Sequence, residues 1–140
     1  MKLNRREALA LGAGTTAAIA FGAFPARASL TDDAIAAFTG GADVTEGGID
    51  LTAPEIAENG NTVPVEVSAD GAAAIMMLAT GNPNPAVGTF NFGPLAGSRS
   101  ASTRIRLAKT QDVTAVARME DGSFRQVSAT VKVTIGGCGG

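Results

Sequence analysis

The chain has 140 residues, 11 Lys and Arg against 13 Asp and Glu, and a formal net charge of −2. A protein that coats nucleic acid carries a strong basic excess, so this balance argues against nucleic-acid binding. There is no His, Tyr or Trp, and there is one cysteine, Cys138. This composition excludes Ser-His and Cys-His catalysis, His-ligated metals, c-type haem, and zinc or iron–sulfur sites built from several thiolates. No phosphate-binding or dinucleotide-binding fingerprint is present, so we expect neither a metal nor a cofactor.

Residues 1–28 have the pattern of an export signal. A basic start with adjacent Arg5 and Arg6 precedes an apolar stretch rich in Ala, Gly and Thr, and Ala26-Arg27-Ala28 provides the small-x-small pattern that signal peptidase cleaves. The paired arginines and the weak hydrophobicity favour the twin-arginine route, with a Sec signal as the alternative. The apolar run is short and interrupted by glycines, which argues against a membrane anchor. We expect the mature protein in the bacterial periplasm, with no membrane attachment.

Cleavage before Ser29 removes 28 of the 140 residues and leaves 112, which suits one domain with a modest core. The signal contains four of the 11 basic residues and one of the 13 acidic residues, so the mature chain keeps seven and 12, for a net charge near −5. Residues 32–70 hold nine acids and no base, whereas residues 99–132 hold all seven bases. We expect these two halves to pair as neighbouring strands, with a bipolar docking surface as the alternative.

The mature chain begins with SLTDDAIAAFTGG, residues 29–41, which predicts a short helix. Thr31 can cap it, two aspartates suit the positive end of its dipole, and a Gly-Gly pair ends it. Ile35 and Phe38 lie one turn apart, so we expect this face to lie against the main body.

Beyond residue 41 the sequence changes to short β-prone runs separated by turn residues. The clearest run is RQVSATVKVTI, residues 125–135, in which apolar and polar residues alternate strictly. Asp121-Gly122 marks the turn of a hairpin before it, and the continuously apolar AAAIMMLAT at 72–80 predicts a central strand. Further runs are VTEGGIDL at 44–51, VPVEVSA at 63–69, AVGTFNF at 86–92 and STRIRLAK at 102–109. Six or seven strands at this spacing predict an all-β fold, an antiparallel β-sandwich over residues 29–135.

The last five residues, 136–140, place Cys138 between two pairs of glycines, Gly136-Gly137 and Gly139-Gly140. Four of the five residues lack a Cβ, so the backbone is thin and can adopt either sign of φ. Fully extended, five residues reach about 17 Å, which would let a thiol enter a narrow cleft of another protein. No base accompanies the thiol in the tail, so nothing there activates it. This favours a covalent carrier whose clients supply the activation, and not an enzyme.

Other interpretations of Cys138 stay open. A lone cysteine in an exported protein is often half of an intermolecular structural disulfide, and the chain would then be a non-catalytic β-sandwich interaction module. The glycines would in that case be an ordinary frayed end. Met76 and Met77 with Cys138 could in principle bind Cu(I), but adjacent strand residues point to opposite faces, so we do not favour a copper site.

The ending KVTIGGCGG, residues 132–140, together with an export signal and a small β-rich domain, resembles the SoxY family. The stretch PEIAENGNTVPVEV, residues 54–67, is also similar to that family. SoxY proteins are sulfur carriers of the bacterial Sox thiosulfate-oxidising system. The resemblance implies an immunoglobulin-like sandwich, a heterodimer with a SoxZ subunit, and sulfur intermediates held on the cysteine that matches Cys138. It further implies that a haem enzyme, a hydrolase and a sulfane-oxidising enzyme of the Sox system are the carrier's clients.

Overall fold

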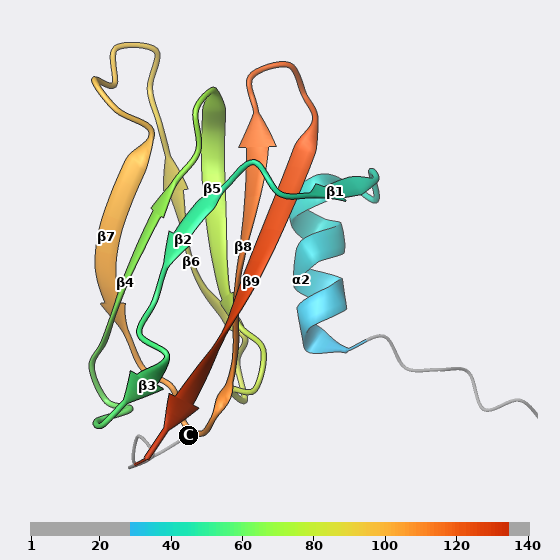
Figure 1. Ribbon diagram of the computed structural model, residues 1–140. Helices are drawn as coiled ribbons and strands as arrows, with labels where there is room; N and C mark the ends of the chain where they lie inside the picture. Colours follow the sequence, from blue (N-terminus) through green and yellow to red (C-terminus); the bar gives the residue numbers. More distant parts are fainter. Residues whose placement is uncertain (1–28, 135–140) are drawn as a thin grey trace, which may run out of the picture.

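The computed structural model describes residues 29–134. The expected export signal at 1–28, with Arg5, Arg6, Ala26 and Ala28, lies outside this range, as do Ile135 and the expected carrier arm at 136–140 with Cys138. Within the range, one helix is followed by nine strands (Figure 1). Their bounds are α2 Leu30–Thr39, β1 Val44–Glu46, β2 Asp50–Thr52, β3 Ile56–Ala57, β4 Val63–Ser68, β5 Ala72–Ala79, β6 Ala86–Asn91, β7 Ser100–Ile105, β8 Gln111–Met119 and β9 Phe124–Val133.

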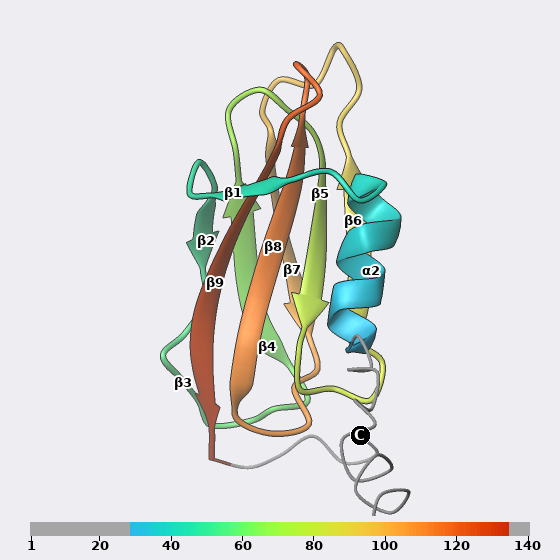
Figure 2. The same cartoon turned by 90° about the vertical axis from the view of Figure 1, so that its right-hand side faces the viewer.

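The strands form a two-layered sandwich, which confirms the predicted fold class (Figures 1 and 2). The larger sheet has the order β1-β9-β8-β5-β6, and β3 pairs with β9 at one end of it. The smaller sheet has the order β2-β4-β7. Most neighbours are antiparallel, but β1 and β3 run parallel to β9. Among residues 29–134, no helix has the length and hydropathy required to cross a bilayer.

The main core lies between the two sheets, and the period of two in each strand puts the apolar residues there. In β4 the buried residues alternate with exposed ones, as expected for a strand with one solvated face. In β5 and β8 both faces are buried, which explains their continuous apolar sequences. The largest fully buried side chains are Ile75, Met77, Leu78, Leu107, Val63, Val67, Val113, Val116 and Val131.

Helix α2 covers the second face of the larger sheet (Figure 2). Ile35 and Phe38 contact a small cluster of Met76, Leu78 and Val116, as the one-turn spacing predicted. Met76 and Met77 therefore point to opposite faces of β5, and both are buried. Two buried thioether side chains on opposite faces serve as core residues, in agreement with the strand geometry.

The start of α2 differs from the sequence prediction. The N-cap is Ser29 and not Thr31, and the Ser29 hydroxyl accepts a hydrogen bond of 3.1 Å from the backbone N–H of Asp32. The Asp32 carboxylate in turn accepts a hydrogen bond from the Ser29 backbone N–H, which completes a capping box. The helix ends as predicted at Gly40, which adopts a left-handed conformation with φ of 67°.

The run VTEGGIDL forms two strands and not one. Gly47 and Gly48 both have positive φ, 93° and 77°, so the chain turns sharply between β1 in the larger sheet and β2 in the smaller one. This crossing and the two-residue β3 raise the number of strands from the expected six or seven to nine.

The acidic and basic halves pair as predicted. Strand β4 of the acidic half is antiparallel to β7 of the basic half, and β1 and β3 pair with β9. The close ion pair found in the described residues lies within the basic half itself, where Arg99 and Glu120 are 2.8 Å apart. Strand pairing therefore brings the acidic and basic halves next to each other.

The predicted hairpin between β8 and β9 is also confirmed, with Gly122 at φ of 85° in its turn. Asp121 accepts hydrogen bonds from the hydroxyl and the backbone N–H of Ser123, at 2.6 and 2.8 Å. These bonds favour the ionised carboxylate, so they hold the pKa of Asp121 below its ordinary value.

A partly buried polar network joins two loops at the end of the sandwich where β9 terminates. The Gln111 side chain donates to Asn82 Oδ1 and to the Lys109 carbonyl, at 2.8 and 3.0 Å, and accepts from the Gly81 N–H at 2.9 Å. Asn82 donates to the Arg106 carbonyl at 2.7 Å and accepts from the Ala108 N–H at 3.0 Å. The loop from 106 to 110 is therefore fixed by side chains from two other segments.

We expect Gly81→Ala to loosen this network. A Cβ at Gly81 would lie 2.9 Å from the Gln111 Cβ, a distance that forces the two segments apart. Overpacking of this kind costs about 1–3 kcal/mol of unfolding free energy. Urea denaturation of the mature chain measures this loss. Gly97→Ala is the matched control, because nothing lies within 4 Å of a Cβ there. Equal stability of the two variants would contradict the close packing described for Gly81.

Candidate functional site

In the sequence, the described segment nearest to the predicted carrier residue Cys138 is the end of β9. Here β3 runs parallel to β9 and pairs Ile56 with Lys132 and Ala57 with Val133. The Lys132 N–H donates to the Glu55 carbonyl at 2.9 Å, and the Thr134 N–H donates to the Ala57 carbonyl at 3.0 Å. The pairing thus continues through the last described residue.

The Thr134 hydroxyl adds to this contact. It lies 3.4 Å from both the Ala57 and the Glu58 carbonyl oxygens, and it donates toward them. Backbone and side chain of Thr134 are therefore directed to the same short segment.

The opposite side of β9 is held by a threonine from the loop before β8. The Val133 N–H donates to the Thr110 hydroxyl oxygen at 2.9 Å, and the same hydroxyl lies 3.4 Å from the Val133 carbonyl, to which it donates. Thr110 in turn precedes Gln111, which anchors its loop. We call residues 132–134, with their partners Thr110 and 55–58, the C-terminal root. The last described residues of the chain are thus hydrogen-bonded on both sides of β9.

Charged side chains surround the C-terminal root without forming a reactive group. Glu55, Glu58, Lys109 and Lys132 are all exposed to solvent. Among residues 29–134, no three carboxylates lie close enough together to hold a metal ion. The contacts described for the root are hydrogen bonds that involve backbone and hydroxyl groups.

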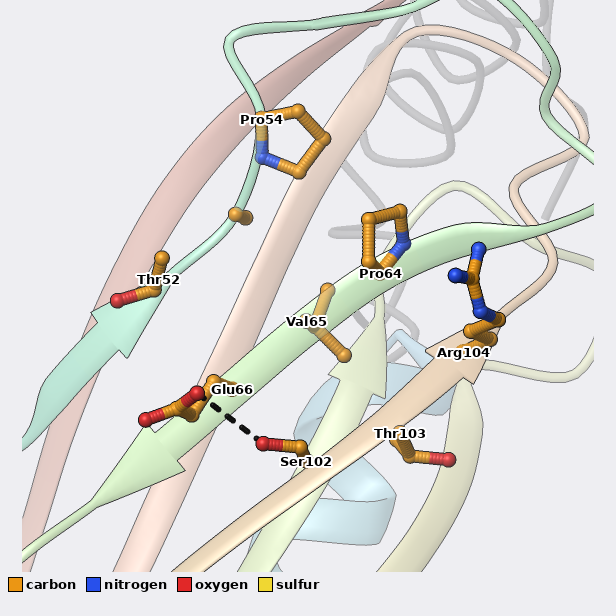
Figure 3. Close-up of a pocket in the computed structure, with 9 residues that line it drawn as sticks. Thr52, Pro54, Pro64, Val65, Glu66, Ser102, Thr103 and Arg104 are labelled. Carbon is orange, nitrogen blue, oxygen red and sulfur yellow. Dashed lines mark hydrogen bonds between the residues drawn. The ribbon is translucent and has the colours of Figure 1, made fainter.

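A groove of about 550 Å³ lies on the outer face of the smaller sheet (Figure 3). It opens because β2 ends at Thr52, so the chain leaves β4 and Pro54 stands opposite Pro64. No β2 residue pairs with Pro64, and its missing N–H therefore leaves no bond unmade on that side. The groove is lined by Thr52, Ala53, Pro54, Pro64, Val65, Glu66, Ser102, Thr103 and Arg104.

The polar groups of the groove are partly engaged with one another. The Ser102 hydroxyl donates to the Glu66 carboxylate at 3.1 Å, as Figure 3 shows, and Arg104 lies 3.5 Å from the Thr62 hydroxyl. Ser102 and Glu66 are both exposed to solvent. Pro54 of the groove directly precedes segment 55–58 of the C-terminal root, so the two features adjoin along the chain.

Sequence reasoning did not find the C-terminal root. The alternation at 125–135 gives Thr134 no role beyond that of a polar strand residue, and no sequence pattern singles out Thr110. The pairing of β3 with β9 joins residues 76 positions apart, Ile56 and Lys132, and no local pattern marks such a contact. The segment 54–67 was noticed only through its family resemblance.

Comparisons with known proteins relate this chain to one family. The family model described as "Sulfur oxidation protein SoxY" matches residues 35–138, which includes Cys138. The solved structure of the sulfur carrier protein SoxY from Chlorobium limicola f thiosulfatophilum is 39% identical, with a TM-score of 0.67, and the match covers 75% of this chain and 96% of that one. The comparison with curated proteins found no match.

More distant structures share the fold alone. A superoxide reductase (neelaredoxin) from Ignicoccus hospitalis is 19% identical with a TM-score of 0.55, covering 62% of this chain and 80% of that one. A putative superoxide reductase from Thermotoga maritima is 14% identical with a TM-score of 0.53, covering 70% and 91%. The extent of the family match and the identity to the Chlorobium protein show that this chain belongs to the SoxY family of sulfur oxidation proteins.

Proposed function

We propose that this protein carries sulfur intermediates on Cys138 and presents them to the enzymes of the Sox pathway, without catalysing the reactions itself. The observation that carries the proposal is the family match, which extends through the glycine-flanked cysteine at the end of the chain. The C-terminal root supports it, because hydrogen bonds to the backbone and from hydroxyl groups hold the end of the strand that leads to the cysteine.

The proposed loading step forms a sulfur–sulfur bond. The Cys138 thiol and the sulfane sulfur of thiosulfate combine to give a Cys–S–S–SO₃⁻ adduct, one proton is released, and two electrons pass to a haem partner. Water then cleaves the bond between sulfane and sulfonate sulfur, which yields sulfate, a proton and a Cys–S–SH persulfide. The sulfane sulfur is afterwards oxidised or passed on, and a second hydrolysis restores the thiol. All oxidants and hydrolytic groups come from the clients.

The C-terminal root gives this carrier a fixed origin. From Thr134, the four residues to Cys138 span at most about 14 Å when fully extended. A thiol on this length of chain reaches a buried client site only if the client docks close to the root. Because the root is bonded on both sides, each client meets the arm at the same starting point.

We further propose that the mature protein is periplasmic and acts as a heterodimer with a SoxZ-type subunit. Export places the thiol where disulfide-level sulfur chemistry persists. A twin-arginine signal, carried by Arg5 and Arg6, suits a chain that folds and binds its partner before export. Replacing both arginines by lysine should retain the protein in the cytoplasm if this route is used, whereas a Sec signal tolerates the change.

Intact mass measurement of the native protein tests the carrier directly. We expect adducts in sulfur-sized and sulfonate-sized increments that a reductant removes, and none in Cys138→Ser. That variant should keep the thermal stability of the wild type, because position 138 follows the last paired strand, and should lose all thiosulfate-dependent activity in a reconstituted pathway. A doubled mass as the sole modification, or a large loss of stability in Cys138→Ser, would instead make the cysteine structural.

The glycines before Cys138 should matter through the absence of side chains. We expect the double variant Gly136→Val, Gly137→Val to react with small thiol reagents at nearly the wild-type rate, while turnover by the large client enzymes falls at least tenfold. Rates of thiol labelling and of client turnover, measured on the same preparations, separate the two effects. Undiminished client turnover would contradict a slender arm that enters narrow sites.

Thr134 and Thr110 should act as positioning residues for the arm. Thr134→Val and Thr110→Val remove the hydroxyls that bond to the carbonyls of Ala57 and Val133, and we expect faster motion of a nitroxide attached to Cys138, with a raised KM for clients. Serine at either position keeps the hydroxyl and should restore both values. Electron paramagnetic resonance of the labelled protein measures the motion.

The control for this pair is Thr130→Val in the same strand. Its hydroxyl donates to the Asp112 side chain at 2.6 Å, away from the C-terminal root. We expect no change in label motion for this variant. Equal motion in all variants would show that the hydroxyl contacts do not restrain the arm.

A further inference from the structure

Strand β6 is an unusual edge of the larger sheet. It pairs with β5 on one side and, among the described strands, with nothing on the other (Figure 1). Its residues from Ala86 to Thr89 are all exposed. A free sheet edge presents unpaired N–H and C=O groups, which invite pairing with another chain.

The absence of charge distinguishes β6 from the other edges. Strands β1, β2 and β7 contain Glu46, Asp50 and Arg104, and β3 is flanked by Glu55 and Glu58. In contrast, the whole segment 71–98 contains no Asp, Glu, Lys or Arg. Charged residues are a common means of protecting sheet edges from association. The other edge strands carry such charged residues in or beside them, whereas β6 has none.

The backbone of β6 shows which groups are available. The Phe92 N–H, directly after the strand, donates to the Ala73 carbonyl at 2.9 Å and so points toward β5. Alternate residues of a strand direct their backbone groups to the same side, so those of Phe90 also point to β5. The backbone groups of Thr89 and Asn91 therefore point away from β5, toward the open edge.

Apolar surface borders this edge. Val87 is 39% exposed and Leu95, in the loop after β6, is 98% exposed. A groove of about 210 Å³ lies between β6 and β7, lined by Met77, Val87, Gly88, Thr89, Phe90 and Thr103. A strand added beside β6 would direct every second side chain toward this groove.

We propose that β6 is the edge to which the partner subunit adds a strand, so that the larger sheet continues into a second β-sandwich. The inference rests on the partner assignment in the proposed function. The occupant is an extended, uncharged strand with apolar residues at alternate positions, since it must pair with Thr89 and Asn91 and fill the groove.

The net charge favours a partner subunit over a second copy of this chain. Two copies carry the same negative net charge and repel each other, whereas a different subunit need not. Strands β8 and β5 separate β6 from β9, so a partner at β6 leaves the C-terminal root free for clients. A carrier with a permanent partner and several clients needs two such separate surfaces.

A lysine on the edge tests the assignment. Thr89→Lys places a charge on β6 that binding would have to desolvate, and Thr45→Lys makes the same change at an exposed position of β1, the opposite edge of the same sheet. With the mature chain and the purified SoxZ-type subunit of the same organism, we expect at least tenfold weaker binding for Thr89→Lys and wild-type binding for Thr45→Lys. Equal thermal midpoints of the two variants confirm that both are folded.

Hydrogen exchange provides a second measurement that needs no variant. Addition of the partner should slow exchange at the amides of Thr89 and Asn91, and leave β1 unchanged. Wild-type binding that Thr89→Lys does not weaken, without protection at these amides, would overturn the β6 assignment alone. Failure of the wild-type chain to bind the partner would overturn the partner assignment as well, while adducts on Cys138 would still report the carrier function.

A second copy is the remaining occupant. If the chain alone forms a dimer that Thr89→Lys dissociates, and partner binding is unaffected, then β6 is a homodimer edge and the proposal is wrong.

Discussion

Hydrogen bonding along both sides of β9 is the constraint on which the rest of the structure depends. On one side it is antiparallel to β8 over eight residue pairs, and on the other it is parallel to β1 and then to β3. A strand bonded in this way cannot shift its register, because a slip of one residue would turn Val131 out of the core. The same pairing continues to Thr134, whose N–H donates to the Ala57 carbonyl, and so fixes the position of Thr134. The stability of the sandwich and the position of the proposed arm therefore have a common origin.

The surface divides into regions with different chemistry. Exposed carboxylates and lysines surround the C-terminal root, a groove with Glu66 and Arg104 lies beside it, and the uncharged edge β6 lies on the far side of the larger sheet. Polar, charged surfaces suit transient complexes that must dissociate again. An uncharged sheet edge with open backbone groups suits a lasting complex. The distribution is the one that the proposed carrier would need if it keeps one partner and meets several clients in turn.

Local patterns predicted the parts of this fold that local interactions determine. The alternation in β9, the apolar run of β5 and the Asp121-Gly122 turn each correspond to an observed element. The sequence prediction placed the helix cap two residues late, at Thr31. Ser29 and Thr31 both carry a hydroxyl that can cap a helix, and the structure uses Ser29 in a capping box. The division of VTEGGIDL depends on which sheet each half joins, and the bonds from Thr110 and Thr134 depend on contacts distant in the chain. A short stretch of sequence predicts neither the division of VTEGGIDL nor these bonds. Cys138 with its flanking glycines, in contrast, can be recognised from sequence alone.

The parallel pairs of β9 also determine the order of events during synthesis. Val44 pairs with Phe124, and Ala57 pairs with Val133. Strands β1 and β3, near the beginning of the domain, can therefore pair only after β9 has been synthesised. Non-local pairings of this kind form slowly. The larger sheet cannot be completed before β9 has been synthesised, and a chain truncated before β9 has no place to attach β1 or β3. Such a chain also lacks Cys138, so under the proposed function an incomplete fold and a missing carrier group occur together.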